Sequence, residues 1–428
     1  MLHSVDVTKG NTRKDSSYYQ EISEYSKLVT PMQNKHLPVY SWYNYKHSFS
    51  RNLVWSVIDT LGLDKDDLVL DPFCGAGTTL LASKQKGIPS VGFDLMPLSV
   101  LISNVKVGKY DETEVRDKLK KMIVETKDAK QAKGNSLKLR LDKYFPRGEL
   151  NRLLRLREAI NHIDDLNMRS LFLLGMLSIV EDASYTRKDG AFIRTVKDKL
   201  TKPVMYAFTE KMALILHDLS YLNSLPEVSS RADLSDARST HLKDKSVSAV
   251  ITSPPYPNRH DYTRIYYLEL MLGFFDDYDS VKRLRYELLR SHVEAREKYV
   301  AEGYNYPEGL EKILADLRKK DLPNRNIIDL VDGYFKDMYV WLNEMHRVLS
   351  PEGTINIIIG DARYGGISIP AGSLVKKIGD DIGFEHVKTI KARDKGNRLI
   401  FEVESSPSLP TGILINWFSE TGYFHRLS

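Results

Sequence analysis

Two short apolar runs separated by one helical segment occur between Asp67 and Asp94. The run DLVLDPF predicts a buried strand, GTTLLASKQKG predicts a helix that ends at Gly87, and IPSVGFD predicts a second strand. A helical connection is typical of two parallel strands, since antiparallel neighbours can be joined by a tight turn. The segment therefore predicts an α/β fold built on a parallel sheet.

Strand signals return in the second half of the chain. SVSAVITS and GTINIIIGDARYGG favour buried strands, and at least two of HVKTIKAR, NRLIFEVE and GILINWF should form strands near the C-terminus. Residues 107–223 favour charged helices without clear strands, and residues 265–349 are again largely helical. SFSRNLVWSVIDTLGL, before the first strand, predicts an amphipathic helix with Ser50 as its N-cap. We therefore expect a parallel sheet that carries two helical insertions.

Composition excludes several kinds of protein. The 428 residues include one cysteine, so an intramolecular disulfide and a zinc site built from cysteines are both excluded. We find no run of 18 apolar residues, and the polar first residues do not resemble a signal peptide. We expect a cytoplasmic protein with no membrane partner.

The distribution of charge is more informative than the net charge of +5. Between Lys109 and Glu158 the chain carries 15 Lys/Arg and 9 Asp/Glu, an excess larger than that of the whole chain. A local basic stretch suits a polyanion such as nucleic acid. A solvated helix face with mixed charges is the alternative.

The turn after the first predicted strand, LDPFCGAGTTL, indicates a ligand site. Gly75 and Gly77 allow a tight turn and a close approach of the backbone, with the next helix aiming its N-terminus there. The turn is no dinucleotide fingerprint, because Leu80 stands where a third glycine belongs, and no Walker loop, because no lysine follows. Asp71 places a negative charge where a cationic ligand group could sit.

A second carboxylate, Asp94, ends the next strand 23 residues after Asp71. This is the usual place for an acid that binds ribose hydroxyls. A strand-to-helix turn with a capping acid is the structural alternative.

The stretch ITSPPYPNRHDY contains two consecutive prolines at the end of a predicted strand. Prolines cannot donate to a sheet ladder, so the strand must stop there. The result is a rigid turn with a hydroxyl on one side, at Ser253, and an aromatic ring on the other, at Tyr256.

DPFCGAGTT together with TSPPY resembles the motifs of the S-adenosylmethionine-dependent amino-methyltransferases of DNA, specifically the cytosine-N4 group. The resemblance covers about residues 40–105 and 232–420, with the cofactor motif before the catalytic motif. It implies a Rossmann-like methyltransferase fold, a mostly parallel sheet with an antiparallel last strand. It also implies S-adenosylmethionine as cofactor without a metal and double-stranded DNA as substrate, and it makes a cognate restriction endonuclease a candidate partner.

The resemblance assigns roles to residues in four segments of the chain. SDARST supplies a contact to the cofactor adenine, and YKHSFS resembles the segment that closes over the methionine end. The implied catalytic residues are Ser253, Pro254, Pro255 and Tyr256, and the implied cofactor-binding residues are Asp71, Phe73, Gly75, Gly77, Thr78, Asp94, Leu95, Asp236 and Ser50.

An exocyclic amine of a base is a poor nucleophile because its lone pair is delocalised into the ring. The Ser253 hydroxyl and the Pro254 carbonyl can accept its protons and hold the nitrogen in line with the methyl group. Tyr256 offers a ring face on which a flipped base stacks. The sequence therefore predicts methylation of the N4 amine of cytosine in a specific DNA sequence, as in restriction-modification or phage defence.

The residues present also help to decide between this reaction and other functions. Cytosine-C5 methylation needs a cysteine nucleophile, and Cys74 lies inside the cofactor turn, so that route is excluded. Adenine-N6 methylation, RNA amino-methylation and a non-catalytic nucleic-acid-binding scaffold remain open.

Residues 1–106 and 230–428 are predicted to form the catalytic domain. Residues 107–229 are predicted to form a basic helical insertion and are the candidate target-recognition region, with residues 265–349 as its competitor.

Overall fold

The computed structural model describes residues 25–128, 140–190, 192–393, 398–403 and 411–416. Within them an eight-stranded sheet has the strand order β10-β11-β12-β7-β6-β1-β2-β5. The strands are β1 (Val69–Asp71), β2 (Ser90–Asp94), β5 (Ser230–Leu234), β6 (Val247–Thr252), β7 (Leu349–Ile359), β10 (Glu385–Arg393), β11 (Arg398–Val403) and β12 (Thr411–Asn416). Neighbours from β12 through β7, β6, β1 and β2 to β5 are parallel. The predicted α/β fold with a mainly parallel sheet is confirmed.

The position of the antiparallel strand differs from the expectation. The last strand, β12, runs parallel to β7, and β11 is antiparallel to both β10 and β12. Because β11 is antiparallel to both neighbours, β12 runs in the same direction as β10, with which it also pairs. All three C-terminal segments that offered strand signals form strands.

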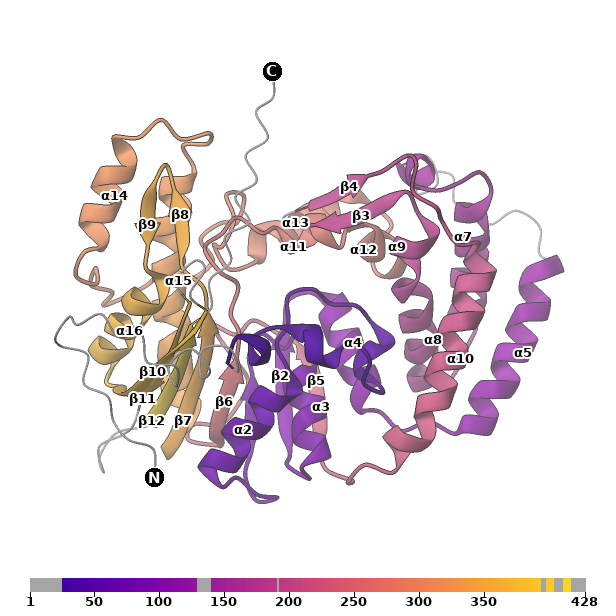
Figure 1. Cartoon of the computed structure of the whole chain (residues 1–428), viewed down its shortest axis with the longest axis horizontal. Helices are drawn as coiled ribbons and strands as arrows, with labels where there is room; N and C mark the ends of the chain where they lie inside the picture. The colour runs from indigo at the N-terminus through magenta and orange to yellow at the C-terminus, as the bar shows by residue number, and fades with distance from the viewer. Residues whose placement is uncertain (1–24, 129–139, 191, 394–397, 404–410, 417–428) are drawn as a thin grey trace, which may run out of the picture.

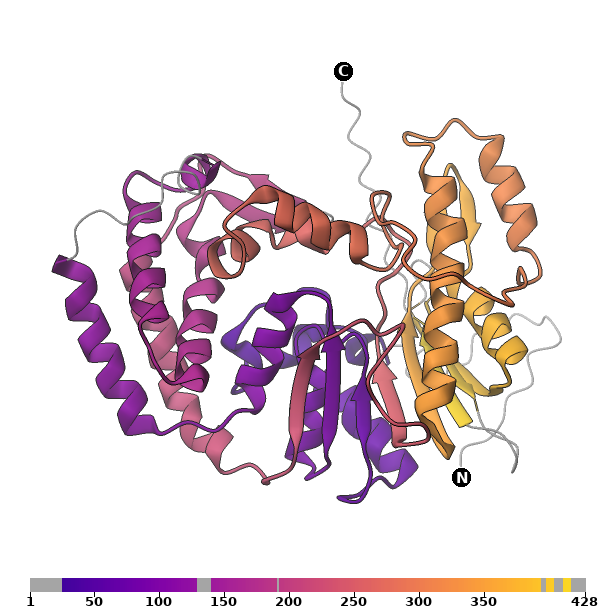
Figure 2. The same ribbon diagram turned by 180° about the vertical axis from the view of Figure 1, so that it is seen from behind.

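Helices cover both faces of the sheet. On one face α2 (Arg51–Leu61) and α3 (Thr78–Gln85) pack against apolar side chains of β1, β6 and β7, and on the other α15 (Ile327–Val348) and α16 (Ala371–Ile382) do so (Figures 1 and 2). Ser50 caps α2 as predicted, since its hydroxyl accepts a hydrogen bond from the Asn52 N–H at 3.2 Å. These layers hold the carboxyl ends of the strands at one rim.

The helical stretch 265–349 is divided between two regions instead of forming one insertion. Its first helices, α11 (Tyr262–Ile265), α12 (Tyr267–Gly273) and α13 (Tyr278–Glu287), lie with the insertion, where α12 contacts α4 (Pro97–Val107). Its later helices, α14 (Leu310–Arg318) and α15, pack beside the sheet with the short hairpin β8 (Ala362–Tyr364) and β9 (Ile367–Ile369). A single sequence pattern thus contributes to both regions.

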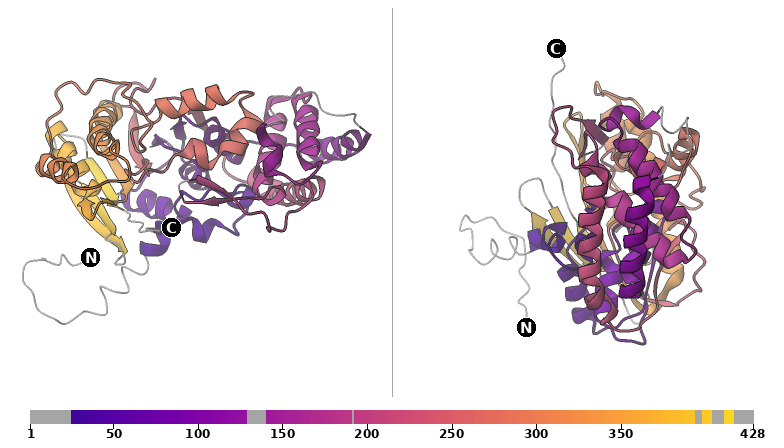
Figure 3. Two further views of the ribbon diagram at one scale, coloured as in Figure 1. Left: turned by 90° about the horizontal axis from the view of Figure 1, so that it is seen from above. Right: turned by 90° about the vertical axis from the view of Figure 1, so that its right-hand side faces the viewer.

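The helices of the predicted insertion stand beside the β5 edge of the sheet (Figures 1 and 3). They are α5 (Glu112–Asp128), α7 (Glu149–Asn161), α8 (Leu166–Ser178), α9 (Val180–Ala183) and α10 (Val204–Asn223). Their apolar core is continuous with side chains of α4 and α12. Because one core runs through both parts, the insertion is packed onto the rest of the protein and is not a module on a linker.

The insertion also contains strands, contrary to the expectation. β3 (Thr186–Asp189) and β4 (Phe192–Thr195) pair as an antiparallel hairpin over the segment TRKDGAFIRT. The strands are short and largely polar, so no apolar alternation signals them, although Asp-Gly is a typical hairpin turn. In the part of the chain that the structure describes, no helix is both long and apolar enough to cross a membrane.

A buried carboxylate fastens the N-terminal segment to the insertion. Asp218 on α10 accepts hydrogen bonds from the Val39 N–H and from the Trp42 indole N–H, both at 2.9 Å. Trp42 is fully buried in η2 (Tyr40–Trp42), and Asp218 is itself buried. The contact orders the segment that leads to α2 and to the site described below.

Replacing Asp218 by alanine should lower the free energy of unfolding, because it leaves two buried N–H donors without an acceptor. Each such donor costs about 1–3 kcal/mol. The midpoint of urea unfolding should fall accordingly, whereas Asp276→Ala, whose side chain is 83% exposed, should change stability by at most about 0.5 kcal/mol. Equal midpoints for the two variants would contradict the anchoring role.

Candidate active site

A pocket lies at the carboxyl ends of β1, β2, β5 and β6, where parallel strands place their ligand sites. Seven of the predicted site residues line it: Phe73, Gly75, Asp94, Leu95, Asp236, Ser253 and Pro255. The cofactor motif and the catalytic motif therefore meet in one pocket, although about 180 residues of sequence separate them.

Asp94 is held in place by the backbone around it. Its carboxylate accepts hydrogen bonds from the Gly75 N–H at 3.1 Å and from the Met96 N–H at 2.8 Å. Burial raises its pKa to about 6, and these backbone donors oppose the rise. A carboxylate has about four acceptor positions, so it can still accept hydrogen bonds from a ligand in the pocket.

The two glycines of the turn serve different purposes. Gly75 has φ of 45° and lines the pocket, so its lack of a side chain leaves room beside Tyr45. Gly77 has φ of 70°, and a Cβ there would lie 2.8 Å from the Ser103 Cα on α4. Gly77 therefore permits the close packing of the turn on α4, and it does not line the pocket.

A free negative charge facing the ligand was expected at Asp71. The structure differs, because the Asp71 carboxylate does not line the pocket. Its carboxylate accepts hydrogen bonds from the Thr79 hydroxyl at 2.7 Å, the Thr252 hydroxyl at 2.6 Å and the Phe73 N–H at 3.2 Å. Burial raises the pKa of Asp71 to about 6, and the hydrogen bonds from Thr252 and Thr79 oppose the rise. The side chain joins β1, α3 and β6 beneath the pocket.

Asp236 lines the pocket as part of an ion-pair network. Arg238 donates to both of its carboxylate oxygens, at 3.0 and 2.9 Å, and Lys298 lies 3.2 Å away. Burial alone would raise the pKa of Asp236, but Arg238 and Lys298 hold it below its usual value. Arg238 also donates to Asp337 on α15, so the network ties the pocket to the helix behind it.

The catalytic motif presents a pair of hydroxyl groups. The Ser253 Oγ and the Tyr256 phenol oxygen lie 2.9 Å apart and share a hydrogen bond. Ser253 and Pro255 line the pocket, whereas Pro254 is buried and Tyr256 packs against the apolar core below α15. Only a ring face was expected from Tyr256 on the basis of the sequence. The hydrogen bond between its hydroxyl and Ser253 was not predicted.

Besides Asp71, Gly77, Pro254 and Tyr256, two further predicted residues do not line the pocket. Ser50 is fully buried; it caps α2 and hydrogen-bonds to the Gln33 side chain at 2.6 Å. Thr78 begins α3, and its hydroxyl lies 2.8 Å from that of Ser48 in a separate hollow. In the structure the Ser50 side chain therefore serves as the N-cap of α2.

The remaining wall of the pocket comes from residues that the sequence analysis did not identify. They are Tyr45, His47, Pro72, Met96, Ser235, Ala237, Arg238, Tyr262, Leu288, Leu289 and Ser291. His47 belongs to YKHSFS, which was singled out for a different residue, and burial lowers its pKa to about 3, so the ring is neutral. Leu288, Leu289 and Ser291 follow α13, and no local pattern signals that long-range packing brings them here.

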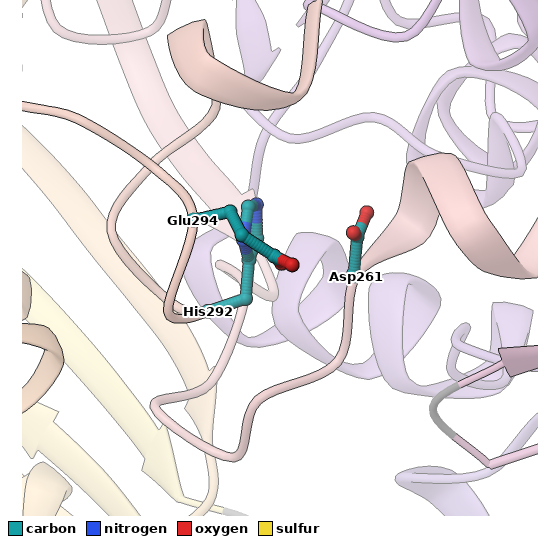
Figure 4. Close-up of side chains that lie close together, drawn as sticks. All are labelled: Asp261, His292 and Glu294. Atoms are coloured by element: carbon teal, nitrogen blue, oxygen red, sulfur yellow. The ribbon is translucent and has the colours of Figure 1, made fainter. Parts of the chain in front are cut away.

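Asp261, His292 and Glu294 form a cluster beside the pocket (Figure 4). Their potential ligand atoms lie within 4.8 Å of one another, so the cluster offers donors of the kind that metals bind. Arg285 lies 2.8 Å from the Asp261 carboxylate, and Arg264 pairs with both Asp261 and Glu294. In the structure the two arginines supply the positive charge beside these carboxylates, and the expectation of a site without a metal stays a prediction.

Comparison with known proteins identifies the family. The chain is 33% identical to the type II methyltransferase M.BsoBI of Geobacillus stearothermophilus, over 87% of this chain and 84% of that protein. It is 30% identical to the type II methyltransferase M.AvaI of Nostoc sp., with the same coverage. The chain belongs to the type II DNA methyltransferases. A family profile described as DNA methylase also matches residues 6–104 of this methyltransferase.

Membership of this family implies S-adenosylmethionine as the methyl donor. The pocket fits that molecule, because it combines the carboxylate of Asp94, the glycine at position 75 and apolar walls that include Phe73, Leu95 and Met96. A ribose needs hydroxyl acceptors and an adenine ring needs apolar surface, and the pocket supplies both.

Asp94→Ala should weaken binding of S-adenosylmethionine while leaving the fold intact. Losing a charged acceptor of ribose hydroxyls costs about 1.5–3 kcal/mol, roughly ten- to hundredfold in affinity. Calorimetry measures the change, and Asp66→Ala, at an exposed aspartate in the loop before β1, is the control. Unchanged affinity in Asp94→Ala would exclude the ribose contact.

The affinity of the unaltered protein for S-adenosylmethionine should also depend on pH. Because burial raises the pKa of Asp94 to about 6, its carboxylate is charged above that pH and protonated below it. Affinity should therefore be full near neutral pH and fall as the pH decreases through about 6. Asp94→Asn should remove this dependence; if the dependence persists, another group such as Asp71 controls it.

Proposed function

We propose that this methyltransferase transfers a methyl group from S-adenosylmethionine to the N4 amine of a cytosine flipped out of a specific double-stranded DNA sequence. The observation that carries the proposal is the position of Ser253, in the same pocket as Asp94 and 2.9 Å from the Tyr256 hydroxyl. A hydroxyl at this place favours cytosine, because the adenine-N6 enzymes of this fold usually carry Asp or Asn there.

The proposed catalytic residues act mainly by positioning the amine against the methyl group, and proton transfer is a smaller part of their role. S-adenosylmethionine supplies a methyl group already activated by its sulfonium. The Ser253 hydroxyl and the Pro254 carbonyl accept hydrogen bonds from the N–H groups of the amine, which directs the nitrogen lone pair toward the methyl group. As the N–CH3 bond forms, the S–CH3 bond breaks, S-adenosylhomocysteine leaves, and the methylated nitrogen releases one proton to solvent. Two prolines fix the turn, so neither acceptor needs to reorganise during the reaction.

Tyr256 contributes a ring face for the flipped base and a hydroxyl that holds Ser253. Among the residues that line the pocket, Asp94 and Asp236 are the proposed contacts of the ribose and the adenine, and Phe73, Gly75 and Leu95 border the same space. The proposed roles of Ser50, Gly77 and Thr78 are structural, because each is explained by packing or capping outside the pocket.

Adenine-N6 methylation is the second candidate. The matched family includes both N6 and N4 methylases, and the pocket can place an adenine amine against the same two acceptors. The partners proposed for either reaction are double-stranded DNA and a cognate restriction endonuclease, as in restriction-modification, with residues 107–229 as the target-recognition region.

Ser253→Ala should lower the rate of methyl transfer and leave the affinity for S-adenosylmethionine nearly unchanged. The lost hydrogen bond acts on the amine mainly in the transition state, so kcat falls more than KM changes. Single-turnover kinetics measure the step, and Ser246→Ala, at the opposite end of β6, is the matched control. A variant with the unaltered rate would exclude Ser253 from the site.

Substitutions of Tyr256 should separate its two contributions. Tyr256→Ala removes the stacking face, which is worth about 1–3 kcal/mol in base binding, and should weaken both binding and turnover. Tyr256→Phe keeps the face and loses the hydrogen bond to Ser253, so it should retain most of the activity. Equal losses in the two variants would mean that the hydroxyl matters more than the ring.

Nucleoside mass spectrometry of DNA treated with the methyltransferase and methyl-labelled cofactor should reveal N4-methylcytosine. If N6-methyladenine is the only modified base found, the proposed target base is wrong and the proposed mechanism still stands. Finding no methylated base, despite tight binding of the cofactor, would overturn the proposed function.

A further inference from the structure

A second hollow, of about 510 Å³, lies between the insertion and helices α11–α13. In the part of the chain that the structure describes, its lining contains four cationic and four aromatic side chains and no acidic one. The lining residues are Arg140, Lys143, Tyr144, Phe192, Ile193, Arg264, Tyr267, Tyr278 and Arg285. We call this hollow the Arg-Tyr groove. Its volume is within the range of about 300–1,000 Å³ that is usual for pockets that bind a small molecule or one nucleotide unit.

The Arg-Tyr groove adjoins the pocket of Asp94 and Ser253. The short helix α11 forms a shared wall, because Tyr262 at its start lines that pocket and Arg264 lines the groove. The same segment directly continues the catalytic motif TSPPYPNRHD. A DNA strand that delivers its base to the pocket therefore passes within reach of the groove.

The cations of the groove fall into two pairs. Arg264 and Arg285 are held by Asp261, and Arg285 also donates to the Thr263 hydroxyl at 2.9 Å, so both are fixed parts of the wall. Arg140 and Lys143 are exposed, and within the described residues neither has an ion pair. The excess positive charge of the groove therefore lies on these two side chains.

Three of the four aromatic side chains of the groove are in contact with one another. Tyr267 stands edge-on to Tyr144, with ring centroids 6.5 Å apart, and to Tyr278, with centroids 6.1 Å apart. Phe192 on β4 is 54% exposed, which is unusual for a large apolar ring. Lys143 lies over the ring of Tyr144, 5.0 Å from its centroid, and has no carboxylate partner among the described residues. Half-buried and exposed rings beside cations without an ion pair match a nucleic-acid strand, whose bases stack and whose phosphates carry negative charge.

The charged face of α5 is a weaker candidate for this role. Arg116 pairs with Glu112 and Lys120 with Asp117 on the same helix, so part of its positive charge is neutralised. In Figure 1 α5 lies at the outer edge of the molecule, away from α11. The sequence pattern alone favoured the whole basic stretch, whereas the contacts favour the part of it that contains Arg140 and Lys143.

We propose that the Arg-Tyr groove binds the DNA strand next to the target base, with phosphates against Arg140 and Lys143 and one base ring against Phe192. The inference rests on the proposed function and adds the place where the flanking nucleotides bind. It makes the junction of the insertion and α11–α13, and not the insertion alone, the DNA-binding part of the protein.

Binding of a short fluorescent DNA duplex over a range of salt concentrations tests the phosphate contacts. Lys143→Gln should lower the slope of log affinity against log salt by about 0.9, and Lys143→Arg should preserve it. Lys121→Gln removes the same charge from an exposed lysine of α5 and should leave the slope unchanged. If the slope is the same in Lys143→Gln, or falls as much in Lys121→Gln, the groove is not the DNA site.

The base contact has a separate readout. Phe192→Ala should weaken DNA binding roughly five- to hundredfold without changing the salt slope, and Phe192→Tyr should restore it. Affinity for S-adenosylmethionine should be unchanged in all these variants, since none of the positions lines its pocket. If the unaltered protein methylates DNA but Phe192→Ala binds it normally, the stacking contact is wrong. If the unaltered protein methylates no DNA, the proposed function fails first.

Discussion

The carboxylate of Asp71 is the contact on which the arrangement of the site depends. Burying an ionisable group is costly unless its hydrogen bonds are satisfied, and here three donors surround it, from Thr79, Thr252 and the Phe73 backbone. Those donors belong to α3, to the end of β6 and to the cofactor turn. One side chain thus sets the distance between the turn that faces the cofactor and the strand that carries Ser253.

A second buried network supports the pocket from behind. Asp337 is fully buried on α15 and accepts hydrogen bonds from Arg238 at 3.0 Å and from Arg290 at 2.7 Å. A buried ion pair is tolerated only when its partners are well matched, and these arginines donate through several N–H groups at once. The network joins Asp236, α15 and the segment that carries Leu288 and Leu289, so the pocket wall is connected to the helix that packs on the sheet.

Local patterns predicted the core of the site, and long-range packing determined the rest. The β1-α3-β2 unit, Asp94 and the end of β6 were predictable because turns, periodicity and strand ends are local properties. The wall at Leu288–Ser291 was not, since residues far apart in sequence meet there. The inward orientation of Asp71 depends on Thr252, whose proximity only the parallel pairing of β1 with β6 reveals. The β3–β4 hairpin was missed because its strands are short and polar.

The continuous apolar core between the insertion and α4 and α12 limits how the insertion, which is the proposed target-recognition region, can change. A recognition unit that shared no core with the catalytic sheet could be exchanged whole between relatives. Here an exchange would remove buried partners of α4 and α12, and with them the support of the cofactor turn at Gly77. Exposed side chains on the surface of the insertion, such as Lys143 and Phe192, can instead be replaced one at a time, because their substitution costs the fold little.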